Sequence, residues 1–218
     1  VNSEENKYKL WKFLKIGSED VITIYNPIDT KEVLDLASEE MPPEVQDICR
    51  GKKVFVTTGR LIKSKNQLAI IRSFRHILEP AVLLILWEGP ERILLERTIQ
   101  ELELSKNVFL LGFKENIFPY IHRADYFIYA SQVEWFPNAI LEAMTLKKPI
   151  ISTDFETWAR ECILGRYIPW ILEYPKVGIH WVLLWKHNFE KDFIDFLPLL
   201  HTLSEQSWVH KIGSTVLS

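Results

Sequence analysis

The stretch Ser131–Asp154, SQVEWFPNAILEAMTLKKPIISTD, decides the fold of this chain of 218 residues. We expect a loop carrying Glu134, then a helix that begins near Pro137, then a buried strand at Pro149–Ser152. Proline suits the first turn of a helix, because its missing N–H needs no partner there and its fixed φ already fits. A helix that starts where a parallel strand ends offers unpaired N–H groups and a positive dipole end to an anion. The stretch therefore predicts an anion site flanked by two carboxylates, Glu134 and Glu142.

A regular alternation of apolar strands and amphipathic helices leads up to this stretch. Strands are expected at residues 54–57, 82–86, 108–111 and 126–130, and helices at 64–78, 90–104 and 117–122. Near-continuous apolar strands that alternate with helices indicate a parallel sheet covered on both faces. We predict an α/β fold with a Rossmann-like doubly wound parallel sheet, in which ligands bind at the carboxyl ends of the strands.

The segments on either side are less regular. Before the alternation we expect a helix at 3–16, a strand at Val21–Tyr25, a helix at 30–37 capped by Thr30, and a loop from Pro42 to Gly51. After it we expect a strand within 178–184 and a helix at 189–203. The predicted division is a tail of a preceding domain or a linker helix at 1–20, the α/β domain at 21–185, and a C-terminal helical segment at 186–218.

Composition excludes several classes of protein. The net charge of −3 has mixed signs, which argues against a nucleic-acid partner. The longest apolar run, Ala81–Trp87, is far shorter than the roughly 20 residues of a membrane span. Cys49 and Cys162 lie far apart in sequence, fit no metal spacing and favour a reducing compartment. We find no Ser-His-Asp or Cys-His constellation, no Walker loop and no signal peptide, and without an initiator Met we expect the chain to begin inside a longer gene product.

Polar residues follow several of the expected strands. Arg60 and Lys65 come directly after the first strand, where Gly59 permits a tight turn. Two cations at this place suit a diphosphate; the alternative is an ordinary solvated basic loop. Gly112 and Phe113 follow the third strand. At this position the Phe113 ring could contact the flat base of a ligand; the alternative is that the ring belongs to the core. Glu142 lies among apolar helix residues, where a carboxylate is costly unless it meets a hydroxyl or a cation; the alternative is a solvated charge.

In order and spacing, these pieces resemble the family-four glycosyltransferases (glycosyl transferases group 1) of the GT-B fold. The resemblance runs from about Val21 to Leu184. It includes VITIYNPID, VTTGRLIKSKNQ, EGPER, NVFLLGF, ADYFIYAS, EWFPNAILE, KPIISTD and ARE. Members of this family are retaining enzymes that use nucleotide sugars. The resemblance therefore implies a transferase that moves a hexose-type sugar from a nucleotide-diphosphate sugar to a glycan or lipid-linked acceptor.

The resemblance also implies a role for each matching residue. Arg60 and Lys65 would bind the donor diphosphate, Glu134 the transferred sugar and Glu142 the nucleotide ribose. Backbone amides near the helix start would hold phosphate, and the turn after the third strand would lie by the base; these positions are Phe136, Asn138 and Ala139, and Gly112 and Phe113. Neither a metal nor another cofactor is expected.

A full enzyme of this family has an N-terminal acceptor-binding domain, which this chain is expected to lack. The chain would then be the C-terminal, nucleotide-sugar-binding half, and by itself would transfer poorly or not at all. The resemblance implies a cytoplasmic protein, peripheral at the inner face of the cell membrane only through the missing domain.

Three tryptophans stand where the family favours glycine: Trp87, Trp135 and Trp158. One hypothesis is that Trp87 and Trp135 obstruct the donor site and leave a non-catalytic nucleotide- or glycan-binding module. A second is that they are tolerated and change the specificity. A third is that glycines encoded by reassigned UGA codons have been read as tryptophan. A further alternative, a nicotinamide-dependent oxidoreductase, is disfavoured because no G-x-G-x-x-G follows the first strand.

Overall fold

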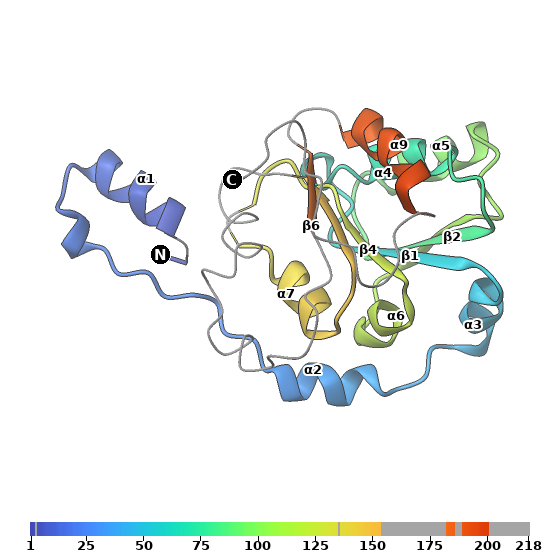
Figure 1. Ribbon diagram of the computed structural model, residues 1–218, viewed down its shortest axis with the longest axis horizontal. Helices are drawn as coiled ribbons and strands as arrows, with labels where there is room; N and C mark the ends of the chain where they lie inside the picture. The colour runs from blue at the N-terminus through green and yellow to red at the C-terminus, as the bar shows by residue number, and fades with distance from the viewer. Residues whose placement is uncertain (3, 135, 154–181, 186–188, 201–218) are drawn as a thin grey trace.

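The computed structural model describes residues 1–2, 4–134, 136–153, 182–185 and 189–200. Its centre is a sheet of six strands: β1 (Lys53–Thr58), β2 (Ala81–Leu86), β3 (Val108–Gly112), β4 (Tyr126–Tyr129), β5 (Ile150–Thr153) and β6 (Val182–Trp185). Their order in the sheet is β3-β2-β1-β4-β5-β6, and all the neighbouring strands pair in parallel. The predicted Rossmann-like doubly wound parallel sheet is therefore confirmed (Figure 1).

Helices cover both faces of the sheet (Figure 1). On one face lie α4 (Gln67–Phe74), α5 (Arg92–Glu101) and α9 (Phe189–Leu200), and on the other α2 (Thr30–Ala37), α3 (Pro43–Cys49), α6 (Phe118–Arg123) and α7 (Asn138–Thr145). The period of two along β1 divides the core accordingly, since Val54 and Val56 join one apolar cluster and Phe55 joins the other. Both clusters are well buried and pack against the strands from opposite faces of the sheet.

The chain reverses its direction of travel across the sheet between β1 and β4. From β1 it proceeds through β2 to the edge at β3, and it then returns to start β4 on the other side of β1. In an open parallel sheet such a switch point leaves a crevice beyond the carboxyl ends of the two central strands. This topology places the loop after β1 beside the loop after β4.

Several expected elements differ from the observed ones. Val21–Tyr25 forms no strand, and the expected loop after Pro42 is instead α3, because Pro43 occupies its first turn, where proline is well tolerated. Asp29, not Thr30, caps α2: its side chain accepts from the backbone N–H of Glu32 at 2.9 Å.

The expected helix at 64–78 is divided and shorter. A 3-10 turn, η2 (Lys63–Lys65), comes first, and Asn66 then adopts φ 57°, a left-handed conformation that no helix continues through. The helix α4 ends at Phe74, and Leu78, expected on its apolar side, is 96% exposed. Pro137 caps α7 rather than lying within its first turn.

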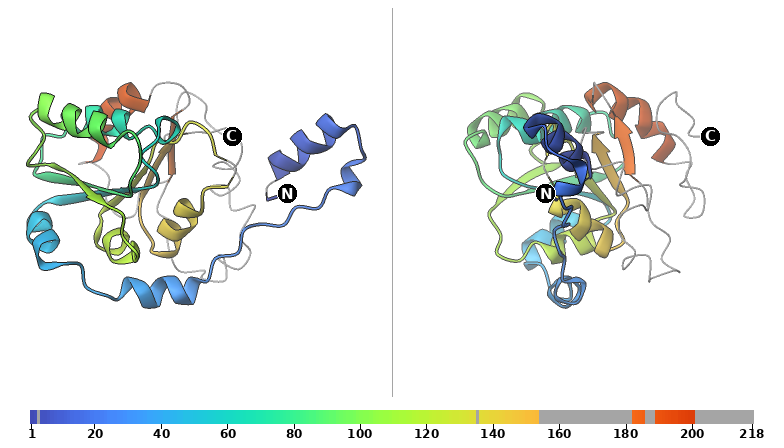
Figure 2. Two further views of the ribbon diagram at one scale, coloured as in Figure 1. Left: turned by 180° about the vertical axis from the view of Figure 1, so that it is seen from behind. Right: turned by 90° about the vertical axis from the view of Figure 1, so that its left-hand side faces the viewer.

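The N-terminal segment stands apart from the sheet in Figure 1 and in the left view of Figure 2. It consists of α1 (Glu4–Leu14), as expected at 3–16, and the one-turn helix η1 (Ser18–Asp20) against which α1 packs. An extended stretch that belongs to none of the six described strands then leads to α2. Of the helices in the described part of the chain, none has the length and hydropathy that spanning a membrane requires.

Candidate functional site

A cavity of about 310 Å³ lies at the carboxyl ends of β1, β2 and β4. It brings together predicted site residues from two separate parts of the chain: Arg60, Lys65, Glu134, Phe136, Asn138, Ala139 and Glu142. The doubly wound topology explains this meeting, because the loops after β1 and β4 border the same switch point. Cations and carboxylates thus line one open pocket.

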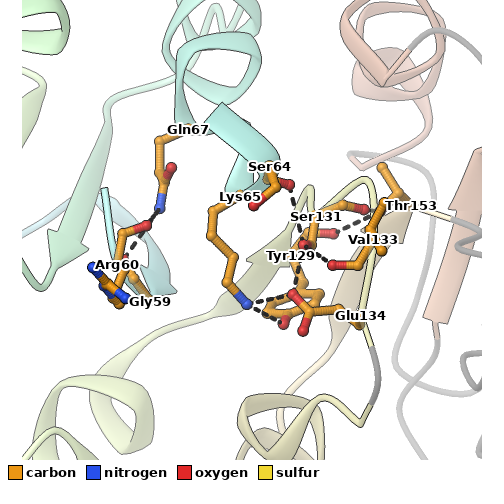
Figure 3. A network of polar contacts seen from close by, with 10 residues as sticks. All are labelled: Gly59, Arg60, Ser64, Lys65, Gln67, Tyr129, Ser131, Val133, Glu134 and Thr153. Carbon is orange, nitrogen blue, oxygen red and sulfur yellow. Dashed lines mark hydrogen bonds and ion pairs between the residues drawn. The ribbon is translucent and has the colours of Figure 1, made fainter. Parts of the chain in front are cut away.

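A polar network occupies one wall of the cavity (Figure 3). The Lys65 ammonium donates to the Glu134 carboxylate in a short contact, and to the Tyr129 hydroxyl at 3.2 Å. Ser131 Oγ donates to the same Glu134 oxygen at 2.5 Å. The side chains of Lys65 and Glu134 are only 23% and 12% exposed, so the ion pair is largely shielded from water.

Tyr129 and Ser131 were not predicted as site residues. Tyr129 ends an apolar strand, ADYFIYAS, and the period of that strand gave no reason to separate it from the core. Burial, and then the neighbouring Glu134 carboxylate, raise the pKa of the Tyr129 phenol far above its ordinary value, so the hydroxyl stays protonated. The feature that could have identified Tyr129 is its position, because it places a polar atom at the last residue of a central parallel strand.

The side chain of Gln67 holds the loop after β1. This side chain is 1% exposed, and its Nε2 donates to the backbone carbonyls of Gly59 at 3.2 Å and Arg60 at 3.1 Å (Figure 3). The turn needs φ 130° at residue 59, which glycine adopts without strain. Arg60 is exposed and lines the cavity, so its guanidinium lies at the cavity rim while Lys65 is deeper.

The start of α7 borders the cavity from the opposite side. Pro137 caps the helix without a side-chain hydrogen bond, while Asn138 and Ala139 line the cavity. One turn further along, Glu142 borders this cavity and a second one of about 220 Å³. Burial raises the pKa of the Glu142 carboxyl above its ordinary value. The predicted alternative of a fully solvated charge at Glu142 is therefore wrong.

Gly112 and Phe113 are not part of the cavity wall, but Trp87 joins them to it. The Trp87 backbone N–H donates to the Gly112 carbonyl at 2.8 Å, and the Trp87 and Phe113 rings meet edge to face with centroids 5.0 Å apart. Trp87 itself lines the cavity. Phe113 is 58% exposed, so the alternative that placed its ring in the core is wrong.

The backbone at Trp87 has a conformation that favours glycine. Its φ is 122°, close to the 130° of Gly59 at the end of the neighbouring strand. The cavity nevertheless keeps a volume of about 310 Å³ with Trp87 in its wall. Trp135 and Trp158 lie outside the described residues, as does most of the predicted segment 186–218. Within the described ranges, no group of three or more His, Cys, Asp or Glu side chains is arranged to hold a metal ion.

Comparison with known proteins places this geometry in context. The profile of the family described as glycosyl transferases group 1 matches residues 40–165. A glycosyltransferase of Methanocaldococcus jannaschii, named as uncharacterized, is 31% identical over 198 residues, which are 89% of this chain and 48% of the relative. An N-acetylgalactosaminyltransferase of Campylobacter jejuni that acts on a diphospho-undecaprenol-linked sugar, by its name, is 32% identical over 160 residues, 73% of this chain and 42% of that protein.

Solved structures agree on the fold. WaaG, a glycosyltransferase involved in lipopolysaccharide biosynthesis, superposes with a TM-score of 0.72 at 14% identity, over 93% of this chain and 53% of its own. HepE of Anabaena in complex with UDP gives 0.70 at 18% identity, over the same shares. The chain spans about half the length of the curated relatives that it matches. The expected resemblance is confirmed, and the oxidoreductase alternative is wrong: this chain belongs to the glycosyl transferases group 1 family and shares the fold of GT-B glycosyltransferases.

Proposed function

We propose that this chain is the donor-binding half of a retaining glycosyltransferase that uses a nucleotide-diphosphate sugar. The observation that carries the proposal is the single cavity shared by Arg60, Lys65, Glu134 and Glu142 at the switch point of the sheet. Cations at its rim and floor suit a diphosphate, and carboxylates suit sugar and ribose hydroxyls. The adjoining start of α7 adds backbone N–H groups and the positive end of the helix dipole.

In the proposed reaction the bond between the anomeric carbon of the donor and its phosphate oxygen breaks. The acceptor hydroxyl attacks the same face of the sugar, and its proton passes to the departing phosphate. Arg60, Lys65 and the α7 start stabilise the negative charge that develops on the diphosphate, which is the main electrostatic task in such a transfer. The proposal requires no protein nucleophile and no metal.

The acceptor and the location follow from the relatives only as part of this proposal. The Campylobacter relative is named for transfer to a diphospho-undecaprenol-linked sugar, and an Escherichia coli relative is named as a galactosyltransferase acting on another such acceptor. We therefore propose a hexose-type sugar, a glycan or lipid-linked acceptor, and a cytoplasmic protein that reaches the membrane only through a further domain. Since the relatives are about twice as long, transfer by the chain alone is expected to be poor.

The alternative is a degenerate, non-catalytic binding module. Trp87 at φ 122° in the cavity wall is the observation that favours it. The volume that remains beside Trp87 favours a working donor site instead. Assaying transfer after fusion to an upstream domain distinguishes them, because the degenerate module stays inactive in that setting.

Calorimetric titration of the 218-residue chain with UDP, GDP, ADP and dTDP tests the donor site directly. We expect at least one nucleoside diphosphate to bind, and Lys65→Ala to weaken that binding by about tenfold or more, because a charge-assisted phosphate contact is lost. Lys63→Ala is the matched control: it removes the same charge from the same turn, but Lys63 is exposed and does not line the cavity. No binding by any of the four nucleotides, or equal effects of the two substitutions, would contradict the proposal.

A further inference from the structure

The starting observation is that two side chains with different proposed ligands bind each other. Lys65 is the proposed diphosphate contact and Glu134 the proposed sugar contact, yet the Lys65 ammonium donates directly to the Glu134 carboxylate. Tyr129 and Ser131 hydrogen-bond to the same pair (Figure 3). The cation of the phosphate site is thus already neutralised by an anion of the protein.

The burial of this pair makes any exchange of partners costly. Both side chains are mostly shielded, and separating a buried ion pair without new partners leaves two charges uncompensated. A diphosphate that approaches Lys65 has two options. It displaces Glu134, which then needs new hydrogen-bond donors, or it binds beside Glu134 and suffers repulsion between like charges.

An intact sugar nucleotide resolves this conflict and a free nucleoside diphosphate does not. The diphosphate of the donor takes the place of Glu134 at Lys65, while sugar hydroxyls donate to the carboxylate that has been displaced. The free nucleoside diphosphate brings no such hydroxyls at that end, and its terminal phosphate carries an additional ionisable oxygen. Glu134 therefore opposes binding of the product more than binding of the donor.

Resting on the proposed function, we infer that Glu134 is a specificity-determining residue that competes with the product diphosphate for Lys65 and so favours the intact donor. Ser131 maintains this competition, because its Oγ holds the carboxylate at 2.5 Å in the position that faces Lys65. The backbone carbonyl of Ser131 in turn accepts from the Thr153 hydroxyl of β5, which ties the loop to the sheet. Hydrogen bonds from Lys65 and Ser131 thus hold the carboxylate against the cation.

The test compares the affinities of UDP and UDP-glucose, or of GDP and GDP-mannose if only guanosine nucleotides bind, for the 218-residue chain and for Glu134→Gln. Glutamine keeps the shape and removes the charge. We expect the product nucleotide to bind Glu134→Gln about tenfold more tightly, and the preference for the sugar nucleotide over the product to fall by at least that factor. Ser131→Ala, which leaves both charges in place, is expected to shift the same ratio in the same direction but less.

Glu101→Gln serves as the control, because it makes the same chemical change in an exposed ion pair with Arg97 on α5, outside the cavity. A substitution that merely loosens the fold weakens the binding of both the product and the sugar nucleotide. Tighter binding of the product therefore cannot result from a loosened fold. Unchanged or weaker product binding by Glu134→Gln, with Lys65→Ala still losing binding, would overturn this inference and leave the donor site standing. Absence of binding by every variant and by the wild type would overturn the donor site and this inference with it.

Discussion

At the scale of single residues, Trp87 is the most informative position in the chain. It lies at the end of β2 with φ 122°, while Gly59 makes the corresponding turn at the end of β1 with φ 130°. A side chain with a Cβ at such an angle stores strain of about 1–3 kcal/mol. The partial compensation visible in the structure is the edge-to-face contact between the Trp87 and Phe113 rings.

Comparing two substitutions at this position separates backbone strain from loss of the ring. Trp87→Ala and Trp87→Gly both remove the indole, but only glycine removes the Cβ. We expect the glycine variant to be more stable than the alanine variant by about 1–2 kcal/mol in urea denaturation. Leu94→Ala and Leu94→Gly, within α5, are the control pair. There we expect the reverse order, with the glycine variant less stable than the alanine variant by about 1 kcal/mol.

Equal stability of the two variants at position 87 would show that the turn relaxes around any side chain. The result also bears on the hypothesis that this residue is a glycine in the natural protein. That hypothesis predicts that Trp87→Gly binds nucleotide at least as well as the tryptophan form, and that the codon is UGA. A UGG codon at position 87 would exclude it.

At the scale of the helix, α7 carries a carboxylate, Glu142, that suits ligand binding but lowers the stability of the fold. It is an apolar helix with Ile140, Leu141 and Ala143 buried in the core, and Glu142 lies on the side that borders the cavity. Burial disfavours the ionised form of Glu142 and raises the pKa of its carboxyl above the ordinary 4.5. A buried carboxylate with this property is typical of a group kept for binding rather than for stability.

The sign of the resulting pH dependence follows from proton linkage. The folded chain holds the Glu142 proton more tightly than the unfolded chain. The stabilisation from this group is therefore complete below pH 4.5, and it is lost as the pH rises through the folded pKa of the carboxyl. Glu142→Gln stays neutral throughout. We expect its midpoint of thermal unfolding to exceed that of the wild type at pH 7, with the difference vanishing below pH 4.5.

Thermal unfolding followed by circular dichroism between acidic and neutral pH measures this difference, with Glu101→Gln on α5 as the exposed control. The same Glu142→Gln variant is expected to bind nucleoside diphosphate more weakly, since the ribose loses its proposed acceptor. A variant that is less stable than the wild type at pH 7 would mean that the carboxylate is held by favourable contacts, and the account given for α7 would be wrong.

The elements differ in how well sequence alone predicts them. Continuous apolar runs such as Val82–Leu86 are predicted well, because only a strand covered on both faces tolerates them. Val21–Tyr25 contains more β-branched residues but forms no strand in the structure, which side-chain propensity does not predict because it does not report strand pairing. The rule that ligands bind at the carboxyl ends of parallel strands located Arg60 and Lys65. It did not locate Tyr129, because the expected strand continued to residue 130 whereas β4 ends at Tyr129.

At the scale of the whole molecule, the described chain has two unequal parts. The sheet and its helices form one body with both apolar clusters, whereas α1 packs on η1 and stands away from that body (Figure 2, left). Side chains in this N-terminal segment are notably exposed, with Phe13 at 82%, Ile22 at 71% and Ile24 at 71%. Within it the Val1 amine donates to the Ile22 carbonyl at 3.0 Å, and nearer to α2 the Asn26 side-chain amide donates to the side-chain oxygen of Asn138 on α7 at 3.0 Å.

This arrangement predicts that residues 1–20 contribute little to the stability of the α/β domain. A chain that begins at Val21 should unfold in urea with a free energy within about 0.5 kcal/mol of the full chain, because removing exposed contacts rarely costs more. Its m-value should fall only slightly, since the α1 side chains of Phe13 and Leu14 are largely exposed already in the folded chain. Nucleotide affinity should be unchanged, because none of the described residues before Thr58 lines the cavity. A loss of more than about 1 kcal/mol would instead make α1 an integral part of the domain and move the predicted boundary from residue 21 towards the N-terminus.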